Sequence, residues 1–218
     1  MSNSFTEENY LKAIYKLAIK SEKGVSTNAL AERLDTKASS VTDMIKRLAG
    51  KKLVNYKKYQ GVTLSKKGQQ IAIDIIRKHR LWEVFLVDHL GFGWDEVHDV
   101  AEQMEHVNSD LLVERLDSFL EHPKYDPHGG PIPDSEGNFP APARVKLDEL
   151  NVGKHSKVMG ITENSESFLA YLKKTGLQLG VEFKLNERQD FDRSVEIEVE
   201  GKIVQLSHEV AKNIFVAY

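Results

Sequence analysis

The chain has 218 residues, of which 40% are hydrophobic and 29% are charged, and its formal net charge is −3. This length predicts one large domain or two to three small ones, and the composition is that of an ordinary globular protein with a buried core. The absence of cysteine excludes disulfide bonds and thiolate metal sites.

The longest apolar stretches, such as "VFLV", are far shorter than the roughly 18 residues needed to span a bilayer. The N-terminal segment "MSNSFTEENY" has neither the basic region nor the apolar core of a signal peptide. We therefore expect a cytoplasmic protein that has no membrane partner.

Charge is divided unevenly along the chain. Residues 1–80 carry a net charge of +10, and residues 81–218 carry a net charge of −13. Such asymmetry predicts a basic head that faces phosphates and an acidic body that tolerates cations.

The basic head has the element order of a winged helix-turn-helix. Residues 6–22 predict a first helix with Thr6 as its N-cap, and Ser26 caps a short second helix. A tight turn at 35–38 leads to a third helix that ends near Gly50. The alternating pattern around Gln60-Gly61 then predicts a β-hairpin, which is a wing in this position.

The third helix and the wing supply the residues expected to contact double-stranded DNA. Small hydroxyl side chains at the start of this helix suit base edges, and basic or aromatic side chains suit phosphates. The base-contacting candidates are Ser39, Ser40 and Thr42, and the phosphate-contacting candidates are Lys37, Lys46, Lys57, Lys58 and Tyr59. The alternative is a three-helix module that binds protein, but the charge split and the basic wing favour DNA.

The sequence after the basic head predicts several helices followed by a small β domain. Ser65 caps a long helix over 66–90, "GFGW" breaks it, and helices follow over 97–107 and 109–120. All six prolines lie within 122–143, which predicts a linker or an ordered crossover. Short strand-like segments after residue 154, with one helix at 166–174, predict a small β-barrel. The expected fold class is mainly α with a small β domain.

Histidines and carboxylates gather on two of these helices. In "VHDVAEQMEHV", four such side chains fall within about 100° of one another, beside a separate apolar face. The long helix adds a pair at i and i+4. Together they are His79, Glu83, His98, Glu102, Glu105 and His106. These oxygen and nitrogen donors suit manganese(II), iron(II), cobalt(II) or zinc(II), and the many carboxylates favour the harder ions.

This group of histidines and carboxylates also allows two roles besides the binding of a regulatory metal. It is a solvated surface if the chain is a metal-independent winged-helix regulator. It is a catalytic centre if the chain is a metal-dependent hydrolase, but "HDVAE" is not the HExxH motif, and no nucleophile motif or phosphate-binding glycine loop is present. We therefore expect no enzymatic activity.

Over nearly its whole length the sequence resembles the DtxR/MntR family of metal-dependent transcriptional repressors. The stretches that carry the resemblance are "NYLKAIYKL", "SSVTDMIKRL", "GVTLSKKG", "RKHRLWEVFL", "VHDVAEQMEHV" and "PHGGPIP". The resemblance implies a winged helix-turn-helix head, a helical dimerisation and metal-binding domain, and a C-terminal SH3-like or FeoA-like barrel. The corresponding ranges are 1–65, 66–121 and 144–218, joined by the linker 122–143.

The resemblance also implies two metal sites. The primary site uses Glu102, Glu105, His106 and Asn9, the residue before Tyr10. The second site uses His79, Glu83 and His98, completed by Glu163 and Glu166 of the barrel or by Asp126 and His128 of the linker.

Position 102 bears on the choice of metal. The resemblance implies a cysteine there in iron-type relatives and a glutamate in manganese-type relatives, so Glu102 favours manganese(II), with iron(II) next and zinc(II) or cobalt(II) possible in vitro. The chain departs from the binuclear pattern in its first helix, where Asn9 and Lys12 replace two acids and leave Glu8 as a substitute ligand. The expected function is a homodimeric, metal-activated repressor of metal-uptake genes.

Overall fold

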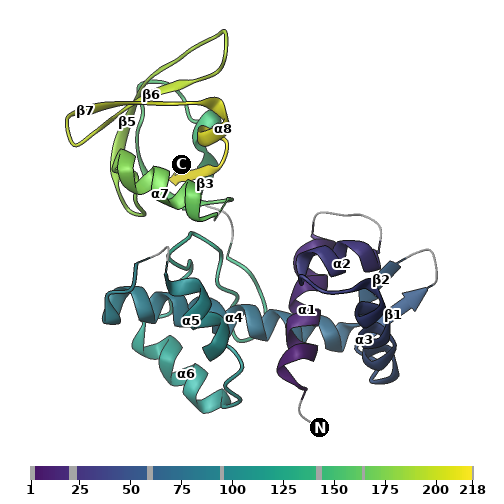
Figure 1. Cartoon of the computed structure of the whole chain (residues 1–218). Helices are drawn as coiled ribbons and strands as arrows, with labels where there is room; N and C mark the ends of the chain where they lie inside the picture. Colours follow the sequence, from purple (N-terminus) through teal and green to yellow (C-terminus); the bar gives the residue numbers. More distant parts are fainter. Residues whose placement is uncertain are drawn as a thin grey trace. The chain divides into compact units, whose positions relative to one another are not determined.

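A computed structural model describes residues 3–19, 24–57, 61–93, 96–140, 144–163 and 165–217. The chain divides into two compact units (Figure 1). Unit 1 comprises residues 1–79, 102–110 and 133–138, and unit 2 comprises residues 80–101, 111–132 and 139–218. No helix in the described part is long and apolar enough to cross a membrane.

Unit 1 contains the predicted winged helix-turn-helix. Its elements are α1 (Phe5–Ala18), α2 (Thr27–Arg33), α3 (Ala38–Gly50), β1 (Val54–Lys57) and β2 (Gly61–Leu64), which Figure 1 draws side by side. The two strands pair antiparallel from Val54 opposite Leu64 to Lys57 opposite Gly61. Backbone hydrogen bonds between Val25 and Val62 tie the wing to the segment before α2. One apolar core, which includes Leu11, Leu30, Ile45 and Val62, holds these elements together.

The first helix begins earlier than the sequence predicted. Ser4, not Thr6, is the N-cap, because the Ser4 hydroxyl accepts a hydrogen bond from the Glu7 backbone N–H while the Glu7 carboxylate accepts one from the Ser4 N–H. This reciprocal pair is a capping box, and it fixes the helix start at Phe5. The helix ends at Ala18, and residues 20–22 of the predicted span lie outside the described residues.

Glu7 also joins α1 to α3. Its carboxylate has no exposed surface, and it lies 2.9 Å from Arg47 Nε and 2.7 Å from Lys51 Nζ. Burial tends to raise the pKa of Glu7, but hydrogen bonds from Lys51 and Ser4 and the charge of Arg47 outweigh it, so the pKa lies below the ordinary 4.5. The stability that Glu7 contributes is therefore complete above pH 4.5 and is lost as the pH falls through its lowered pKa.

Glu7→Gln is expected to lower the free energy of unfolding at pH 7 by about 1–2 kcal/mol, because two cations lose their anionic partner. The variant should also lose less stability than the wild type when the pH is lowered from 7 to 3, because it has no carboxylate to protonate. Urea denaturation at the two pH values measures both effects. An equal acid loss in both proteins would show that the Glu7 charge does not contribute.

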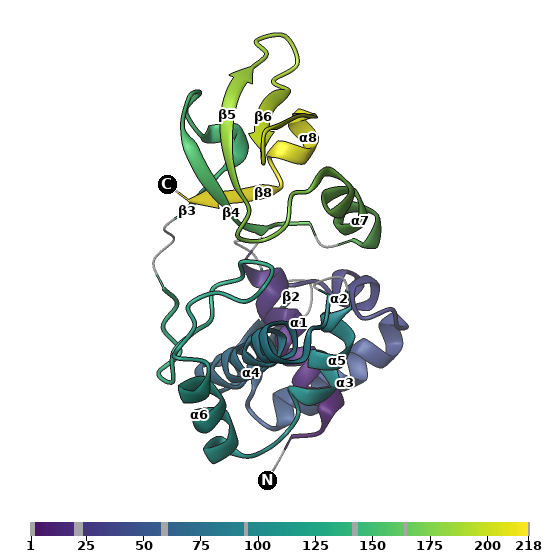
Figure 2. The same cartoon turned by 90° about the vertical axis from the view of Figure 1, so that its left-hand side faces the viewer.

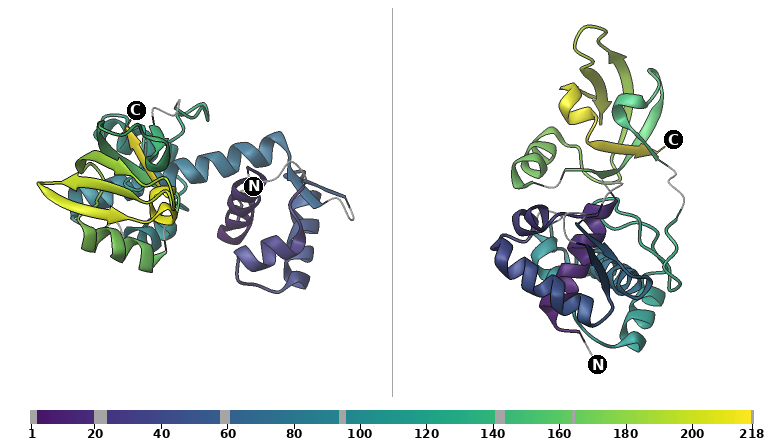
Figure 3. Two further views of the ribbon diagram at one scale, coloured as in Figure 1. Left: turned by 90° about the horizontal axis from the view of Figure 1, so that it is seen from above. Right: turned by 90° about the vertical axis from the view of Figure 1, so that its right-hand side faces the viewer.

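Three helices follow the head. Helix α4 (Lys66–Leu90) is the long helix in the left-hand view of Figure 3, and the Ser65 hydroxyl accepts a hydrogen bond from Gly68 N at its start. Helix α5 (Val97–Met104) is three residues shorter than predicted, and α6 (Asp110–Phe119) matches its predicted span closely. Near the end of α4, Phe85 packs against Phe119 of α6 with ring centroids 6.0 Å apart. Residues 120–140 follow without a helix or strand, as the prolines predicted.

The C-terminal part of unit 2 is a six-stranded antiparallel sheet in the order β3-β8-β4-β5-β6-β7. Its strands are β3 (Arg144–Lys146), β4 (His155–Ile161), β5 (Glu182–Arg188), β6 (Val195–Val199), β7 (Lys202–Leu206) and β8 (Ile214–Ala217). A 3-10 turn (Leu147–Glu149), α7 (Glu166–Thr175) and α8 (His208–Ala211) complete it. Figure 2 shows β4, β5 and β6 adjacent.

The predicted barrel needs one correction. The strand order leaves β3 and β7 as the two ends, so the sheet is SH3-like in its strands but is not closed into a barrel by the pairings of the described residues. Strand β3, helix α8 and strand β8 were not predicted from the sequence. Strand β8 pairs with both β3 and β4, and it buries Ile214 and Val216 in the core of this part.

Candidate functional site

The exposed face of α3 is the candidate DNA-binding surface. Val41, Ile45 and Leu48 recur at helical spacing and are buried in the head, so the opposite face of α3 is left to solvent. Ser39 and Ser40 are exposed on α3, and so is Lys37 at its N-cap position.

The remaining candidate DNA-contacting residues differ in their exposure and in the contacts that their side chains already make. The Thr42 hydroxyl donates to the Ala38 carbonyl at 2.9 Å, and Lys46 lies 3.5 Å from Asp43 in an exposed pair. Lys57 is exposed at the end of β1. The wing residues Lys58 and Tyr59 lie outside the described residues.

The first group of charged side chains lies in unit 1, and we call Lys12, Glu8, Glu102, Glu105 and His106 the α1–α5 cluster. Lys12 Nζ lies 2.5 Å from Glu105 Oε1 and 3.2 Å from Glu102 Oε1. The ammonium group therefore contacts both carboxylates that the sequence assigned to a metal.

Glu105 is the buried centre of this cluster. It has no exposed surface, and its second oxygen Oε2 lies 2.7 Å from His79 Nδ1. Burial tends to raise the pKa of Glu105, but the contact with His79 and the charge of Lys12 outweigh it, so the pKa lies below the ordinary value. The predicted helix over 97–107 was too long at this point: α5 ends at Met104, and Glu105 turns inward from the following turn.

His106 faces α1 as well. Its Nδ1 lies 2.6 Å from Glu8 Oε2, and its ring stacks on Phe5 with centroids 4.6 Å apart. The side-chain oxygen of Asn9 is buried and has no hydrogen-bond partner within the described residues. A bound cation would satisfy this oxygen.

The second group lies in unit 2, and we call Glu83, His98, Asp126 and His128 the Glu83 cluster. Glu83 Oε1 lies 3.3 Å from His98 Nδ1 and 3.5 Å from His128 Nδ1. Ligand atoms of Glu83, Asp126 and His128 all lie within 4.8 Å of one another, and both carboxylates are buried. Helix α4, helix α5 and the linker thus each contribute to one small volume.

Asp126 organises the linker around this cluster. Its Oδ1 accepts hydrogen bonds from the backbone N–H groups of His128 and Gly130, both at 2.8 Å, and its Oδ2 lies 3.2 Å from Arg80 Nε. Burial and the nearby charge of Glu83 raise the pKa of Asp126 above its ordinary value, against the charge of Arg80. Two buried carboxylates that repel one another in this way favour a bound cation.

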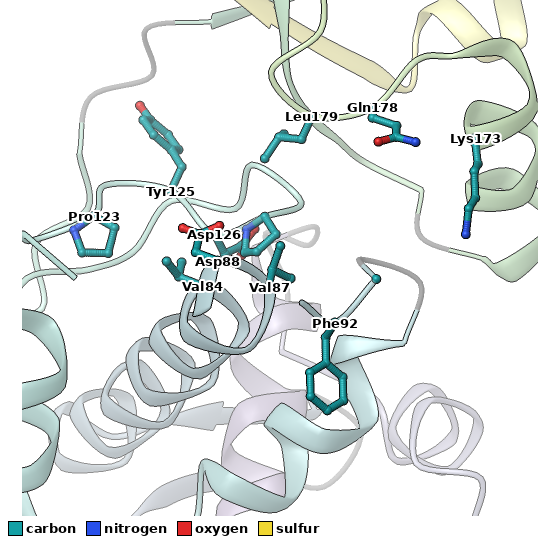
Figure 4. Close-up of a pocket in the computed structure, with 12 residues that line it drawn as sticks. Val84, Val87, Asp88, Phe92, Pro123, Tyr125, Asp126, Lys173, Gln178 and Leu179 are labelled. Carbon is teal, nitrogen blue, oxygen red and sulfur yellow. The ribbon is translucent and has the colours of Figure 1, made fainter. Parts of the chain in front are cut away.

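A cavity of about 490 Å³ in unit 2 reaches Asp126 (Figure 4). Val84, Val87 and Asp88 of α4 line it together with Tyr125 and Asp126. The cavity thus lies beside the Glu83 cluster at Asp126, and Glu83, His98 and His128 are not among its lining residues.

Gly129→Ala is expected to weaken manganese(II) binding at the Glu83 cluster by at least about tenfold. Gly129 has φ +79°, and a Cβ atom there would overlap the Met159 carbonyl oxygen and the Gly160 Cα of β4. The loop that holds His128 must therefore shift. Gly153→Ala is the matched control, because Gly153 has φ +85° but open space around it. If both variants bound manganese(II) equally in a calorimetric titration, the close approach would not position His128.

Glu163 and Glu166, the predicted barrel ligands, lie at the start of α7. Glu163 Oε1 accepts a hydrogen bond from Ser165 N just before α7, and Glu166 is the exposed first residue of that helix. Neither belongs to a group of three or more potential ligands among the described residues.

The two clusters differ in their fit to a divalent ion. The Glu83 cluster combines two buried carboxylates with two partly exposed histidines, and these donor types suit such an ion, although Arg80 already contacts Asp126. The α1–α5 cluster has similar donors, but an ammonium group already contacts its carboxylates. Glu102, Glu105 and His106 do not form a group of ligand atoms within 4.8 Å among the described residues.

Two cations in these clusters, Lys12 and Arg80, were not predicted from the sequence as contacts of the carboxylates. The sequence indicates Lys12 only as the replacement of an acid, although its place one helical turn after Asn9 puts it on the same face of α1. Arg80 also donates to the Pro131 carbonyl and so holds both ends of the "DPHGGP" loop. No spacing in the sequence indicated that contact.

Comparison with known proteins identifies the family in three consecutive parts. Residues 4–62 match the iron dependent repressor N-terminal DNA binding domain, residues 65–134 match the iron dependent repressor metal binding and dimerisation domain, and residues 145–218 match the FeoA domain.

Individual relatives agree. The chain is 30% identical over 220 residues to the diphtheria toxin repressor of Corynebacterium glutamicum, covering 94% of this chain and 93% of that protein. It is 38% identical over 157 residues to the iron-dependent repressor IdeR of Mycobacterium tuberculosis, covering 68% and 67%.

A solved manganese-dependent transcriptional repressor in complex with manganese superimposes with a TM-score of 0.79 at 36% identity, covering 97% of this chain and 99% of that one. The expected resemblance and the expected fold class are confirmed. The chain belongs to the family of iron-dependent repressors, metal-dependent transcriptional repressors that include the diphtheria toxin repressors and the manganese-dependent repressors.

Proposed function

We propose that the protein is a metal-activated DNA-binding repressor of metal-uptake genes that acts as a cytoplasmic homodimer and has no enzymatic activity. The observation that carries this proposal is the Glu83 cluster, two buried carboxylates and two histidines in a chain that also carries a winged helix-turn-helix. These residues would hold a divalent ion, whose positive charge would offset that of the two carboxylates. Residues 1–65 then bind DNA, 66–121 bind metal and dimerise, and 144–218 form the FeoA-like domain after the linker 122–143.

The Glu83 cluster is our proposed regulatory metal site, with ligands Glu83, His98 and His128. Asp126 would be a further ligand, since its Oδ1 accepts hydrogen bonds from two backbone N–H groups while its Oδ2 contacts only Arg80 among the contacts described above. The α1–α5 cluster, with Glu102, Glu105, His106 and Asn9, is the second candidate site, and Glu163 and Glu166 remain candidate additional ligands. His79 remains a candidate ligand, and its Nδ1 contacts Glu105.

Manganese(II) is the proposed metal, iron(II) is the next choice, and zinc(II) or cobalt(II) bind in vitro. Carboxylate and imidazole donors without any thiolate suit manganese(II) and iron(II). The manganese-dependent structural relative agrees with this choice, whereas the sequence relatives named above are iron-dependent or toxin repressors.

The proposed homodimer has a suitable apolar face on α6. Leu111 and Phe119 are 58% and 59% exposed, whereas Leu116 of the same helix is buried. Exposed leucine and phenylalanine on one short helix favour a protein interface.

For DNA, we propose that Ser39, Ser40 and Thr42 reach base edges, while Lys37, Lys46, Lys57, Lys58 and Tyr59 contact phosphates. A second candidate function, a metal-independent winged-helix regulator, is favoured by one observation, the lysine that already neutralises Glu105. Selection of duplexes from a random pool with the full chain, once with manganese(II) and once with a chelator, separates the two. Recovery of one motif with two half-sites in manganese(II) alone is expected, and recovery of the same motif in both selections would favour the metal-independent regulator.

Lys57→Ala is expected to weaken DNA binding and to lower the slope of log K against log salt by about 0.9, because one phosphate contact is lost. Sequence preference should not change. Lys202→Ala on β7 is the control, since it removes the same charge from an exposed position in the C-terminal sheet. Titrations at four salt concentrations measure the slopes, and equal slopes for wild type and Lys57→Ala would remove Lys57 from the interface.

A further inference from the structure

The α1–α5 cluster contains its own buried cation. Lys12 is only 6% exposed, and its Nζ contacts Glu105 Oε1 at 2.5 Å and Glu102 Oε1 at 3.2 Å. Glu105 has no exposed surface, so this ion pair is shielded from water and from salt.

The ammonium group contacts the same oxygen atoms that a metal would need. A divalent ion the size of Mg²⁺ binds carboxylate oxygens at about 2.0–2.1 Å. An ammonium nitrogen already in contact with both Oε1 atoms leaves no room for such an ion, and the two positive charges would repel one another at this distance. The second oxygen of Glu105 is also engaged, because it lies 2.7 Å from His79 Nδ1.

His106, the remaining nitrogen donor of the cluster, lies closer to Glu8 than to Glu105. His106 Nδ1 lies 2.6 Å from Glu8 Oε2, and His106 Nε2 lies 3.7 Å from Glu105 Oε1. The contact with Glu8 joins the turn after α5 to α1, as does the Lys12 pair, whereas the contact with Glu105 lies within that turn. The link between α1 and this turn is thus complete in the described residues without a metal ion.

We propose that Lys12 determines the metal affinity of the α1–α5 cluster: its ammonium group is the resident cation, and a divalent ion binds Glu102, Glu105 and His106 only by displacing it. Lys12 thereby fixes α1 to the turn after α5 in the metal-free protein. The inference rests on the proposed function only for the choice of manganese(II) as the probe.

The test counts bound manganese(II) by the loss of the electron paramagnetic resonance signal of the free ion. The full chain carries Glu83→Gln and His128→Ala, which silence the Glu83 cluster. In this background Lys12→Met is expected to bind one manganese(II) per chain at least about tenfold more tightly than the protein with Lys12, because a competing positive charge is gone. Lys12→Gln, which keeps a hydrogen-bond donor for Glu105, is the second variant if the methionine protein does not fold.

Three control variants test whether the gain in manganese(II) binding comes from the loss of the Lys12 charge beside Glu105. Lys12→Arg keeps the charge and should bind as weakly as the protein with Lys12. Lys51→Met removes a lysine that also pairs with a fully buried carboxylate, Glu7, and should gain no manganese(II). Adding Glu105→Gln to Lys12→Met should abolish the new site.

Tight binding of one manganese(II) per chain when Lys12 is present would overturn the proposal, as would the absence of a gain in both Lys12 variants. No DNA is used, so a failure of the repressor function in the duplex selection would leave this result unaffected, and the two failures are distinguishable.

Discussion

Lys12→Met is expected to lower the free energy of unfolding of the metal-free protein by about 3–5 kcal/mol. The substitution removes the ammonium partner of Glu105, a carboxylate with no exposed surface, while the methionine side chain fills a similar volume. The destabilisation therefore comes from an unpaired buried charge, not from a cavity. Urea denaturation in the presence of a chelator measures it.

Two further variants identify the cause of that loss. Lys46→Met breaks an ion pair whose side chains are 66% and 79% exposed, so its effect should stay within about 0.5 kcal/mol. The double variant Lys12→Met/Glu105→Gln should recover part of the stability, because the buried carboxylate charge is removed together with its partner. Equal small losses in Lys12→Met and Lys46→Met would contradict a buried pair at Glu105.

Glu83→Gln is expected to reduce the manganese(II) affinity of the protein at least a hundredfold, on the order of 3 kcal/mol, and to remove the metal-dependent part of DNA binding. Glu83 is 2% exposed and contacts both His98 and His128, so all the nitrogen donors of the cluster meet at this carboxylate. Glutamine keeps the shape and one acceptor oxygen but supplies no negative charge.

Asp88→Asn is the matched control for Glu83→Gln. Asp88 is exposed on the same helix, and it lines the cavity beside the cluster, but it is not among the grouped ligands of the described residues. It should keep both manganese(II) affinity and metal-dependent DNA binding. The assignment of the regulatory site to the Glu83 cluster fails if calorimetry gives Glu83→Gln the affinity of Asp88→Asn.

Local sequence signals predicted the head well. The Ser26 cap, the third helix that ends near Gly50 and the alternation around Gly61 all rest on short-range features, and the structure confirms each of them. The N-cap of α1 was wrong because Ser4 and Thr6 are both acceptable caps, and only the reciprocal bonds of Ser4 with Glu7 decide between them.

The α1–α5 cluster and the contacts of Glu7 join residues that are far apart in the chain, and local spacing in the sequence does not predict such contacts. Lys12 and Glu105 are separated by 93 positions, and Glu7 and Lys51 by 44. Helical periodicity placed Glu105 on the polar side of a helix over 97–107, but α5 ends at Met104 and the residue turns into the interior. Strand β8 was missed for a related reason, since its position between β3 and β4 arises from pairing with distant segments.

The measurement that tests metal-activated DNA binding most directly is the affinity of the full chain for its selected duplex, at constant ionic strength, with saturating manganese(II) and with a chelator. A coupling of about 1–3 kcal/mol between metal and DNA corresponds to a 5-fold to 150-fold difference. We expect manganese(II) to tighten binding by at least about fivefold in the wild type and in Asp88→Asn but not in Glu83→Gln. Equal affinity for the duplex with manganese(II) and with the chelator in the wild-type protein would contradict metal activation.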